Sequence, residues 1–485
     1  MALRARLVAP PLEPKTFWPW HEVKWASISS SVLTSGERRF EADNYLATAY
    51  GIRVAIETRS KGWSRLSALA RIWQPSRLKG IQVSKGFGTP FLAATQVFDL
   101  RPTPRKWLSL DRTDDAENRF VPSGLILVTR SGSVGRATLA YRPLENVLIT
   151  DDLLRVEPHD RRKWGWIYAF LRSPKCRAIM TASKYGHVIK HLEVGHLEAL
   201  PVPDVGDEML DEFQKGAHEI LRKRDDACDL IQEAEAIFDR QLQKLPVEDG
   251  ETGFSVRSSS FVSGRRRFEA NYHHPQAAAI LHRFKKLGLQ TEPLNDLAVR
   301  IWWLTRFKRV FGDEGMPYMS SDELFSLNPT ITKRVLAEQA ENAEDYLVKG
   351  GWIVMACSGQ TYGLNGSVAL AEKRYENYFF SHDIIRIIPR TDRIRSGYLY
   401  AALGHPKFGR PLVIRNAYGT SIPHLDPNDV AAIPVVRLGN SLENEVADRM
   451  EKAAKLRAQA DDLENAIAER ADALIDQFLH SADSA

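Results

Sequence analysis

Residues 207–245, DEMLDEFQKGAHEILRKRDDACDLIQEAEAIFDRQLQKL, carry an apolar stripe whose positions recur in alternating steps of three and four residues. The stripe consists of Leu210, Phe213, Ala217, Ile220, Ala227, Ile231, Ala234 and Phe238, with Arg224 as its one polar interruption. Spacing of this kind is typical of a coiled-coil helix. At about 1.5 Å rise per residue such a helix is about 58 Å long, so it needs a partner along its length.

A second stretch of the same type runs from Asn440 to Leu479. Its apolar stripe is predicted at Leu442, Val446, Ala453, Leu456, Ala460, Leu463, Ile467 and Leu474, interrupted by Arg449 and Arg470. We expect the two helices to pair with each other. A chain that returns through a globular domain most simply places them antiparallel.

The second half of the chain repeats the sequence of the first half, at an offset that begins near 227 residues and drifts to 233. The repeated pairs are RFEADNY (39–45) and RFEANY (267–272), GTPFLAATQVFDLRP (88–102) and GMPYMSSDELFSLNP (315–329), GLILVTRSG (124–132) and GWIVMACSG (351–359), WIYAFLRSPK (166–175) and YLYAALGHPK (398–407), and YGHVIKHLEVGHLEALPVP (185–203) and YGTSIPHLDPNDVAAIPVV (418–436). Repeats in one order indicate a duplicated domain.

The duplication predicts the domain organisation of the chain. We expect a globular domain at 29–206 with its helix at 207–245, a linker at 246–264, a second domain at 265–439 and its helix at 440–480. Residues 1–28, with Trp18, Trp20 and Trp25, form an extension outside the duplicated pattern. Strand-like and helix-like runs alternate in each half, which predicts a mixed α+β fold.

Composition narrows the class of protein. Lys and Arg outnumber Asp and Glu by 66 to 61, so the surface is mildly basic and compatible with nucleic acid. The three cysteines, Cys176, Cys228 and Cys357, are far apart and form neither a disulfide framework nor a cysteine-rich zinc site. Prolines interrupt the first residues before a signal peptide can form, and no apolar run approaches the ~20 residues of a membrane span. We therefore expect a cytoplasmic protein.

Motifs for self-sufficient catalysis are missing from the sequence. It contains no P-loop, no adenine methyltransferase motif and no nuclease cluster of carboxylates with a lysine. Ser131 and Ser133 lack a G-x-S-x-G turn, and the second copy replaces their surroundings. The pairs His191 and His424, and Asp152 and Asp383, occupy equivalent positions, where keeping the fold explains them better than catalysis or metal binding does. We expect no catalytic residue and no metal site.

Two domains on a rigid spacer suit an extended object that is contacted at two places, and DNA is such an object. Polar residues after the predicted strands are candidates to bond base edges or phosphates: Arg130, Ser131, Ser133 and Arg136, and in the second copy Ser358, Gln360, Tyr362 and Asn365. Basic runs and their counterparts add Arg77, Lys79, Lys85, Lys184, Tyr185, His187, Lys190, Arg306, Lys308, Arg309, Arg415, Tyr418, Thr420 and Ser421. Solvated glycine-rich turns and solvated basic faces are the alternative interpretation of these residues.

The order of elements resembles the DNA specificity subunit of type I restriction-modification systems. The resemblance covers about residues 36–479 and rests on GLILVTRSGSVGRA (124–137), WIYAFLRSP (166–174), the YG at 185–186, LEALPVP (197–203) before the helix, and the same series in the second copy. It implies two target recognition domains, each followed by a long helix, with the helices in an antiparallel coiled coil. Each domain would read one half of a bipartite target, and the helices would set the unread gap.

The resemblance further implies a chain without catalytic activity or cofactor of its own. Two methyltransferase subunits would dock on it and bind S-adenosylmethionine, and motor-nuclease subunits can join to form a restriction complex. The N-terminal extension and the longer second loop, MACSGQTYGLNG (355–366), depart from the pattern, so a related defence system is equally compatible. The alternative function is a non-catalytic coiled-coil scaffold without specific DNA readout.

Overall fold

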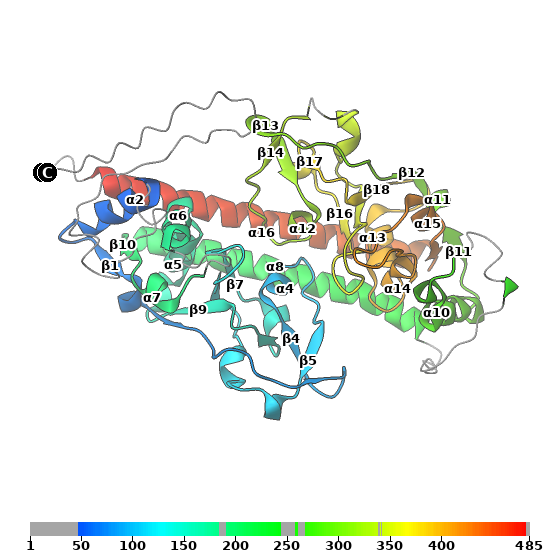
Figure 1. Cartoon of the computed structure of the whole chain (residues 1–485), viewed down its shortest axis with the longest axis horizontal. Coiled ribbons are helices and arrows are strands. Elements are labelled where there is room, and N and C mark those ends of the chain that lie inside the picture. Colours follow the sequence, from blue (N-terminus) through cyan, green and yellow to red (C-terminus); the bar gives the residue numbers. More distant parts are fainter. Residues whose placement is uncertain are drawn as a thin grey trace, which may run out of the picture.

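The molecule is built on two long helices that lie side by side. The computed structural model describes residues 47–183, 191–243, 258–259, 267–337, 340 and 342–481. Helix α8 (Asp207–Leu242) and helix α16 (Asn440–His480) run along the long axis, with one globular domain on each side of the pair (Figure 1). Ion pairs of Arg449 with Glu233 and of Arg470 with Glu212 join late residues of one helix to early residues of the other, which confirms the antiparallel arrangement.

The buried stripe of α8 agrees with the prediction, whereas that of α16 differs. Every predicted stripe residue of α8 is buried, and so is Arg224. In α16 the positions 233 residues after the α8 stripe are also buried, namely Glu443, Val446, Met450, Ala453, Arg457, Ala460, Glu464, Ile467 and Ala471. The predicted Val446, Ala453, Ala460 and Ile467 are thus confirmed, whereas Leu442, Leu456, Leu463 and Leu474 are only partly buried, and Arg449 and Arg470 lie outside the stripe. The stripe contains the charged Glu443, Arg457 and Glu464 because each has polar partners inside the molecule.

The first domain contains two four-stranded sheets and a two-stranded one. The larger core sheet has the order β2 (Ala70–Trp73), β9 (Leu153–Pro158), β6 (Ile126–Thr129) and β7 (Ala137–Leu139), all antiparallel. A smaller sheet has the order β3 (Gln82–Val83), β5 (Lys106–Leu108), β4 (Thr89–Leu92) and β8 (Leu148–Ile149), where β4 and β8 are parallel. Strands β1 (Trp63–Arg65) and β10 (Pro201–Pro203) pair beside the start of α8.

In the part of the first domain that the structure describes, six α-helices accompany these sheets. They are α2 (Ala47–Glu57), α3 (Leu66–Leu69), α4 (Ala94–Val97), α5 (Trp164–Arg172), α6 (Pro174–Ser183) and α7 (Val194–Glu198).

The second domain repeats this plan, except that among the described residues its smaller sheet has three strands where the first domain has four. Its core sheet has the order β12 (Ala298–Trp302), β18 (Ile384–Pro389), β15 (Ile353–Ala356) and β16 (Val368–Leu370). Its smaller sheet has the order β14 (Arg334–Val335), β13 (Phe311–Met319) and β17 (Phe379–Phe380), with β13 and β17 parallel, and β11 (Thr291–Pro293) pairs with β19 (Pro434–Val436). The accompanying helices are α10 (Pro275–Lys286), α11 (Leu294–Leu297), α12 (Ser321–Leu324), α13 (Ser396–Gly404), α14 (Arg410–Ile414) and α15 (Pro427–Ala431). The mixed α+β fold with two repeated domains is therefore confirmed.

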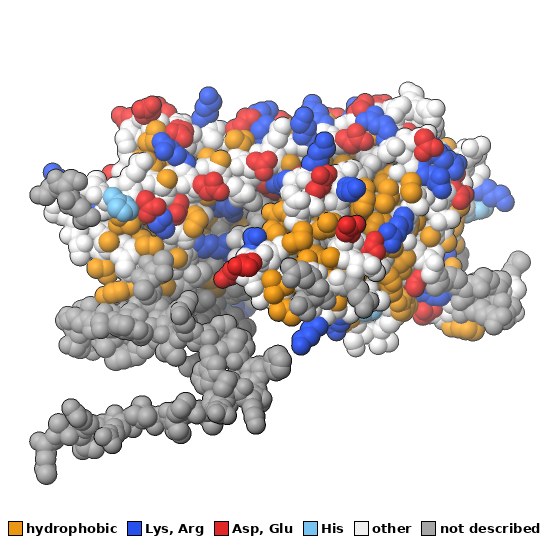
Figure 2. Space-filling view, turned by 90° about the horizontal axis from the view of Figure 1, so that it is seen from above, with side chains coloured by type: hydrophobic (Ala, Val, Ile, Leu, Met, Phe, Trp, Pro, Cys, Tyr) orange, Lys and Arg blue, Asp and Glu red, His pale blue; other side chains and the backbone are white. Residues whose placement is uncertain are grey.

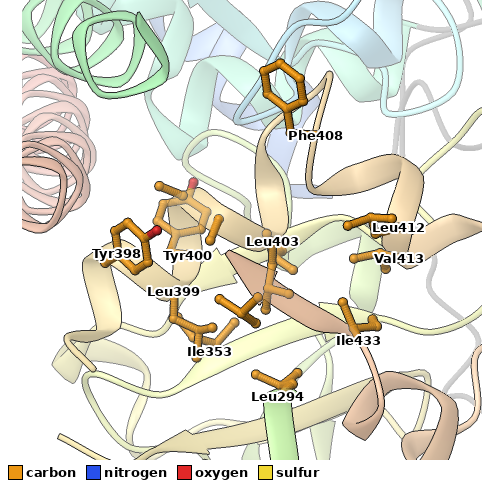
Figure 3. Packing of buried hydrophobic residues seen from close by; sticks show 14 of the residues in the cluster. Leu294, Ile353, Tyr398, Leu399, Tyr400, Leu403, Phe408, Leu412, Val413 and Ile433 are labelled. Atoms are coloured by element: carbon orange, nitrogen blue, oxygen red, sulfur yellow. The ribbon is translucent and has the colours of Figure 1, made fainter. Parts of the chain in front are cut away.

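Equivalent helices attach each domain to the long helix that follows it. A Cβ atom at Gly165 of α5 would lie 2.4 Å from the Phe213 carbonyl of α8, and one at Gly397 of α13 would lie 2.5 Å from the Ala447 carbonyl of α16. Only glycine allows these backbones to approach so closely. On its other side α13 packs on the core sheet, where Figure 3 shows Leu399 beside Ile353 of β15. Each domain is thus fixed to its long helix by backbone contact as well as by side chains.

The two domains also meet each other, through equivalent residues. The Leu100 N–H donates to the Phe325 carbonyl at 2.8 Å, and the Leu327 N–H donates to the Phe98 carbonyl at 2.7 Å. By the 227-residue offset, Phe98 and Leu100 correspond to Phe325 and Leu327. Such reciprocal contact is the mark of a two-fold axis. An approximate two-fold axis therefore passes between Asp99 and Ser326, which form the bridge.

Candidate nucleic-acid interface

The loops that follow β6 and β15 face each other across one cleft at this axis. Ser131, Ser133 and Arg136 line it from the first domain, and Ser358 and Gln360 line it from the second. Its volume is ≈ 580 Å³, which is in the range of a small-molecule pocket and too small for a duplex. The structure thus brings the two predicted loops together, and only their outer edges can meet DNA in this conformation.

Arg130 and the loop serines bond to carboxylates of their own domains. A guanidinium nitrogen of Arg130 lies 2.6 Å from Glu193, and another lies 3.8 Å from Asp152. The Ser131 hydroxyl donates to Asp152 at 3.1 Å, and the equivalent Ser358 hydroxyl donates to Asp383 at 2.8 Å. The interpretation that Asp152 and Asp383 keep the fold is confirmed, because both brace the same loop in each copy.

Arg136 is a correction to the predicted site. Its side chain crosses to the second domain, donates to the carbonyls of Leu327 and Asn328, and stacks 4.1 Å from the centre of the Phe98 ring. Burial, together with the nearby cation of Arg172, lowers the pKa of Arg136 to about 9, so it still carries its charge at neutral pH. This arginine joins the two domains, and it is half-buried where it lines the cleft.

Asn365 is a second correction. Its side chain is fully buried and its amide donates to the carbonyls of Gly359 and Pro423 at 3.0 and 2.9 Å. The prediction that it contacts DNA is wrong for this conformation, because the amide holds the Gly359 loop against the Pro423 segment. Sequence alone could not separate this buried asparagine from the exposed Gln360 and Tyr362 of the same loop.

The remaining polar residues of the second copy form an exposed edge. The Gln360 amide donates to the Ser421 carbonyl at 2.8 Å, which joins two exposed loops. Tyr362 is 69 % exposed and Thr420 is exposed beside them. Tyr418 is half-buried and exchanges backbone hydrogen bonds with His424, at 2.9 and 2.8 Å. Arg415 stacks over the Tyr272 ring at 4.6 Å. These side chains remain candidates for DNA contact.

The two basic runs occupy equivalent exposed places beside the smaller sheets. Arg77 and Lys79 precede β3, and Lys85 follows it with its amine 5.7 Å from the Trp107 ring. Arg306, Lys308 and Arg309 precede β13, and Arg309 donates to the Tyr318 hydroxyl at 3.1 Å. Sequence reasoning missed further exposed cations on the same sheets, at Lys106, Arg112, Lys333 and Arg334. The repeat could have found two of them, because Lys106 and Lys333 are equivalent at the 227 offset.

Some predicted residues lie outside the described residues. They are Lys184, Tyr185, His187 and Lys190, the extension 1–28, and the linker 246–264 apart from Ser258 and Ser259.

On the face seen in Figure 2, Lys and Arg side chains are scattered among Asp and Glu, with hydrophobic side chains gathered near its middle and right. The candidate interface is therefore defined by particular exposed cations and loops.

The described residues offer little for redox or metal chemistry. Within them no three His, Cys, Asp or Glu side chains gather as a metal site would require. Burial raises the pKa of the Cys357 thiol to about 12 and that of Cys176 well above its usual value, so neither is a ready nucleophile. None of the helices in the described ranges combines the length and the apolar character that crossing a membrane needs.

Solved structures of type I restriction-modification S subunits are similar to this chain over most of its length. The type I restriction-modification S subunit from M. genitalium shares 15 % identity over 86 % of this chain and 96 % of its own, with a TM-score of 0.29. The HsdS subunit from Thermoanaerobacter tengcongensis shares 14 % identity over 84 % of this chain and 95 % of its own, with a TM-score of 0.26. A structure described for complex assembly and conformational transition of the type I R-M system shares 14 % identity over 86 % of this chain and 97 % of its own. Its TM-score is 0.26.

No family model and no curated protein matches the chain.

Proposed function

We propose that this chain is the DNA specificity subunit of a type I restriction-modification system or of a related defence system. It reads a bipartite duplex target, one half with each domain, and provides the docking surface for two methyltransferase subunits, and in a restriction complex for motor-nuclease subunits. The observation that carries the proposal is the approximate two-fold axis that relates two domains on one antiparallel helix pair. A two-fold reader matches two sites separated by a fixed number of base pairs.

The exposed residues support DNA as the object that is read. Equivalent basic runs flank the smaller sheet of each domain, and phosphate contacts by such residues position a protein on a duplex. The loop residues differ between the copies whereas the strands match, so the two half-sites need not have the same sequence. Methyl transfer and S-adenosylmethionine binding would belong to the methyltransferase partner. Such a complex would act in the cytoplasm.

The proposal is tested with the complex of this chain and its methyltransferase subunit. Fluorescence anisotropy should show duplex binding that weakens by roughly 10³-fold or more between about 50 and 200 mM salt, if about six phosphates are contacted. Mapping of methylated adenines in cells with and without this chain should reveal a bipartite motif that depends on it. A complex that binds no duplex at low salt, or methylation that is unchanged without the chain, would favour the scaffold alternative.

A further inference from the structure

The turn between β3 and β4, residues 84–88 with the sequence Ser-Lys-Gly-Phe-Gly, presents an aromatic side chain to solvent. Phe87 is 83 % exposed, more than any other large hydrophobic side chain of the described residues. The turn is well defined, since the Phe87 N–H donates to the Ser84 carbonyl at 3.1 Å and Gly86 has a φ of +94°. A positive φ at the third residue of a tight turn is the position that favours glycine. The backbone therefore holds the ring outward.

Lysines are exposed in this turn and along the adjoining segments. Lys85 belongs to the same turn, while Lys79 and Lys106 are exposed before β3 and on β5. Two further exposed hydrophobic residues, Ile81 at 57 % and Leu110 at 44 %, flank the same sheet, and Asp111 and Asp114 are its nearby exposed acids. An apolar tip set among Lys side chains is complementary to nucleic acid, where phosphates meet the cations and base edges meet the ring.

The second domain keeps one glycine contact of this segment and changes the residues before it. A Cβ at Gly88 would lie 2.6 Å from the Leu108 carbonyl, and one at the equivalent Gly315 would lie 2.5 Å from the Val335 carbonyl. Leu108 and Val335 are themselves equivalent at the 227 offset. The residues before the glycine are the turn Ser-Lys-Gly-Phe (84–87) in one copy and Phe-Gly-Asp-Glu (311–314), which belong to strand β13 and its irregular register, in the other. A purely structural segment would not need to differ in this way beside the same glycine contact, whereas two readers of different half-sites would.

Resting on the proposed function, we propose that residues 84–88 are the base-reading element of the first domain. The turn enters the major groove, Phe87 contacts the 5-methyl group of a thymine, and Lys85 donates to the acceptors of a neighbouring guanine. Apolar contact with the thymine methyl and Lys or Arg contact with guanine are the readout modes open to these side chains. Arg77 and Lys79 contact the flanking phosphates and carry no sequence information.

The test compares Phe87→Ala and Lys85→Ala with the control Phe268→Ala, which removes a ring that is 71 % exposed in the second copy. Each variant is expressed with the methyltransferase subunit, and methylated adenines are mapped across the genome. Phe87→Ala and Lys85→Ala should each relax the preference at one or two positions of one half-site by about 10- to 100-fold, while the other half-site and the control stay unchanged. The substituted side chains are exposed, so the melting temperature should not change.

The outcomes separate this inference from the proposed function. If both variants methylate the same sites with the same efficiency as the unsubstituted chain, the turn does not read bases, although the specificity function stands. If Phe87→Ala lowers methylation at all sites equally and reduces co-purification of the methyltransferase, the ring docks a protein and the inference is overturned. If the unsubstituted chain directs no methylation and binds no duplex, the proposed function fails together with the inference.

Discussion

Glu464 is an ion buried at the centre of the helix pair, with only 1 % of its surface exposed. Its carboxylate accepts hydrogen bonds from Arg224 at 2.9 Å and Asn328 at 2.6 Å, from the Tyr168 hydroxyl, and pairs with Arg172 at 3.1 Å. Burial alone would raise the pKa of Glu464, but the two arginine cations outweigh it and lower this pKa to about 2. One carboxylate thus joins both domains to both helices.

Removal of this charge should destabilise the protein strongly. Glu464→Gln removes the carboxylate that pairs with buried Arg172 and leaves Arg224 with Asp461 at 3.6 Å, which we expect to cost about 3–5 kcal/mol. Urea unfolding at neutral pH measures the loss, and Glu469→Gln, an exposed change in the same helix, should have little effect. Because the pKa in the folded state lies below the ordinary 4.5, the stabilisation is present above pH 4.5 and is lost as pH falls toward 2. An equal deficit at every pH would contradict this account.

The pKa of Asp99, at the two-fold axis, is shifted in the opposite direction to that of Glu464. Burial raises its pKa from 3.8 to about 6, a rise that Arg105 opposes and Asp322 increases. Stability from this group is therefore full below pH 3.8 and lost as pH rises through 6. We predict that Asp99→Asn is more stable than the unsubstituted chain at pH 8, by at most about 3 kcal/mol, and nearly equal at pH 4. Melting temperatures of the variant and of the unsubstituted chain at the two pH values test this prediction. A lower melting temperature of the variant at pH 8 would refute it.

At the level of elements, the close approach of α5 to α8 is the most sensitive contact. Gly165→Ala places a Cβ 2.4 Å from the backbone of α8, so α5 must move away, at a cost of about 1–3 kcal/mol. Gly51→Ala in α2 is the matched control, because nothing lies within 4 Å of a Cβ there and alanine favours a helix. Melting temperatures should fall for the first variant and stay equal or rise for the second. Equal melting temperatures for both variants would mean that the contact is loose.

The sequence predicted which helices and domains form better than it predicted which helix faces are buried. The duplicated motifs and the alternating steps of three and four predicted two long antiparallel helices and two mixed domains, because periodicity follows directly from burial. In α16 the prediction was one position off where it chose Leu456 and Leu463. An apolar stripe read from the sequence takes these leucines in place of the charged Arg457 and Glu464, which are the buried residues. Charges become buried only where partners from other elements meet them, and Glu464 finds its partners on α5, α8 and the second domain. Aligning α16 with α8 at the 233 offset would have found the buried face.

The candidate site was predictable in its basic runs and less so in its loops. The basic runs at 76–80 and 305–309 predict solvent-exposed cations, and Lys79 and Arg306 are exposed. Arg136 and Asn365 look equally polar in sequence, yet each bonds to backbone carbonyls of a segment far along the chain. Phe87 was not predicted at all, because an aromatic residue in a short strand-rich segment is ordinarily a core residue. Only the turn geometry reveals that its ring faces solvent.

For the whole molecule, the two domains should act as separate readers on one frame. Replacing residues 36–206 with the recognition domain of another specificity subunit should change one half of the methylated motif and leave the other half unchanged. Methylation mapping of the hybrid complex measures this, and the unsubstituted chain expressed with the same methyltransferase is the control. A hybrid whose motif changes in both halves would contradict the two-reader model.

Two backbone hydrogen bonds join the domains at Phe98, Leu100, Phe325 and Leu327, and side chains add to them. Phe98 packs in one apolar cluster with Leu327, Leu100 packs against the cluster that contains Phe325, and the Ser326 hydroxyl donates to the Phe98 carbonyl at 3.2 Å. A recognition domain exchanged by recombination would therefore meet the half that stays through the same two peptide hydrogen bonds, provided that it keeps apolar residues at these positions. Within that restriction the joint makes the molecule modular in inheritance as well as in shape.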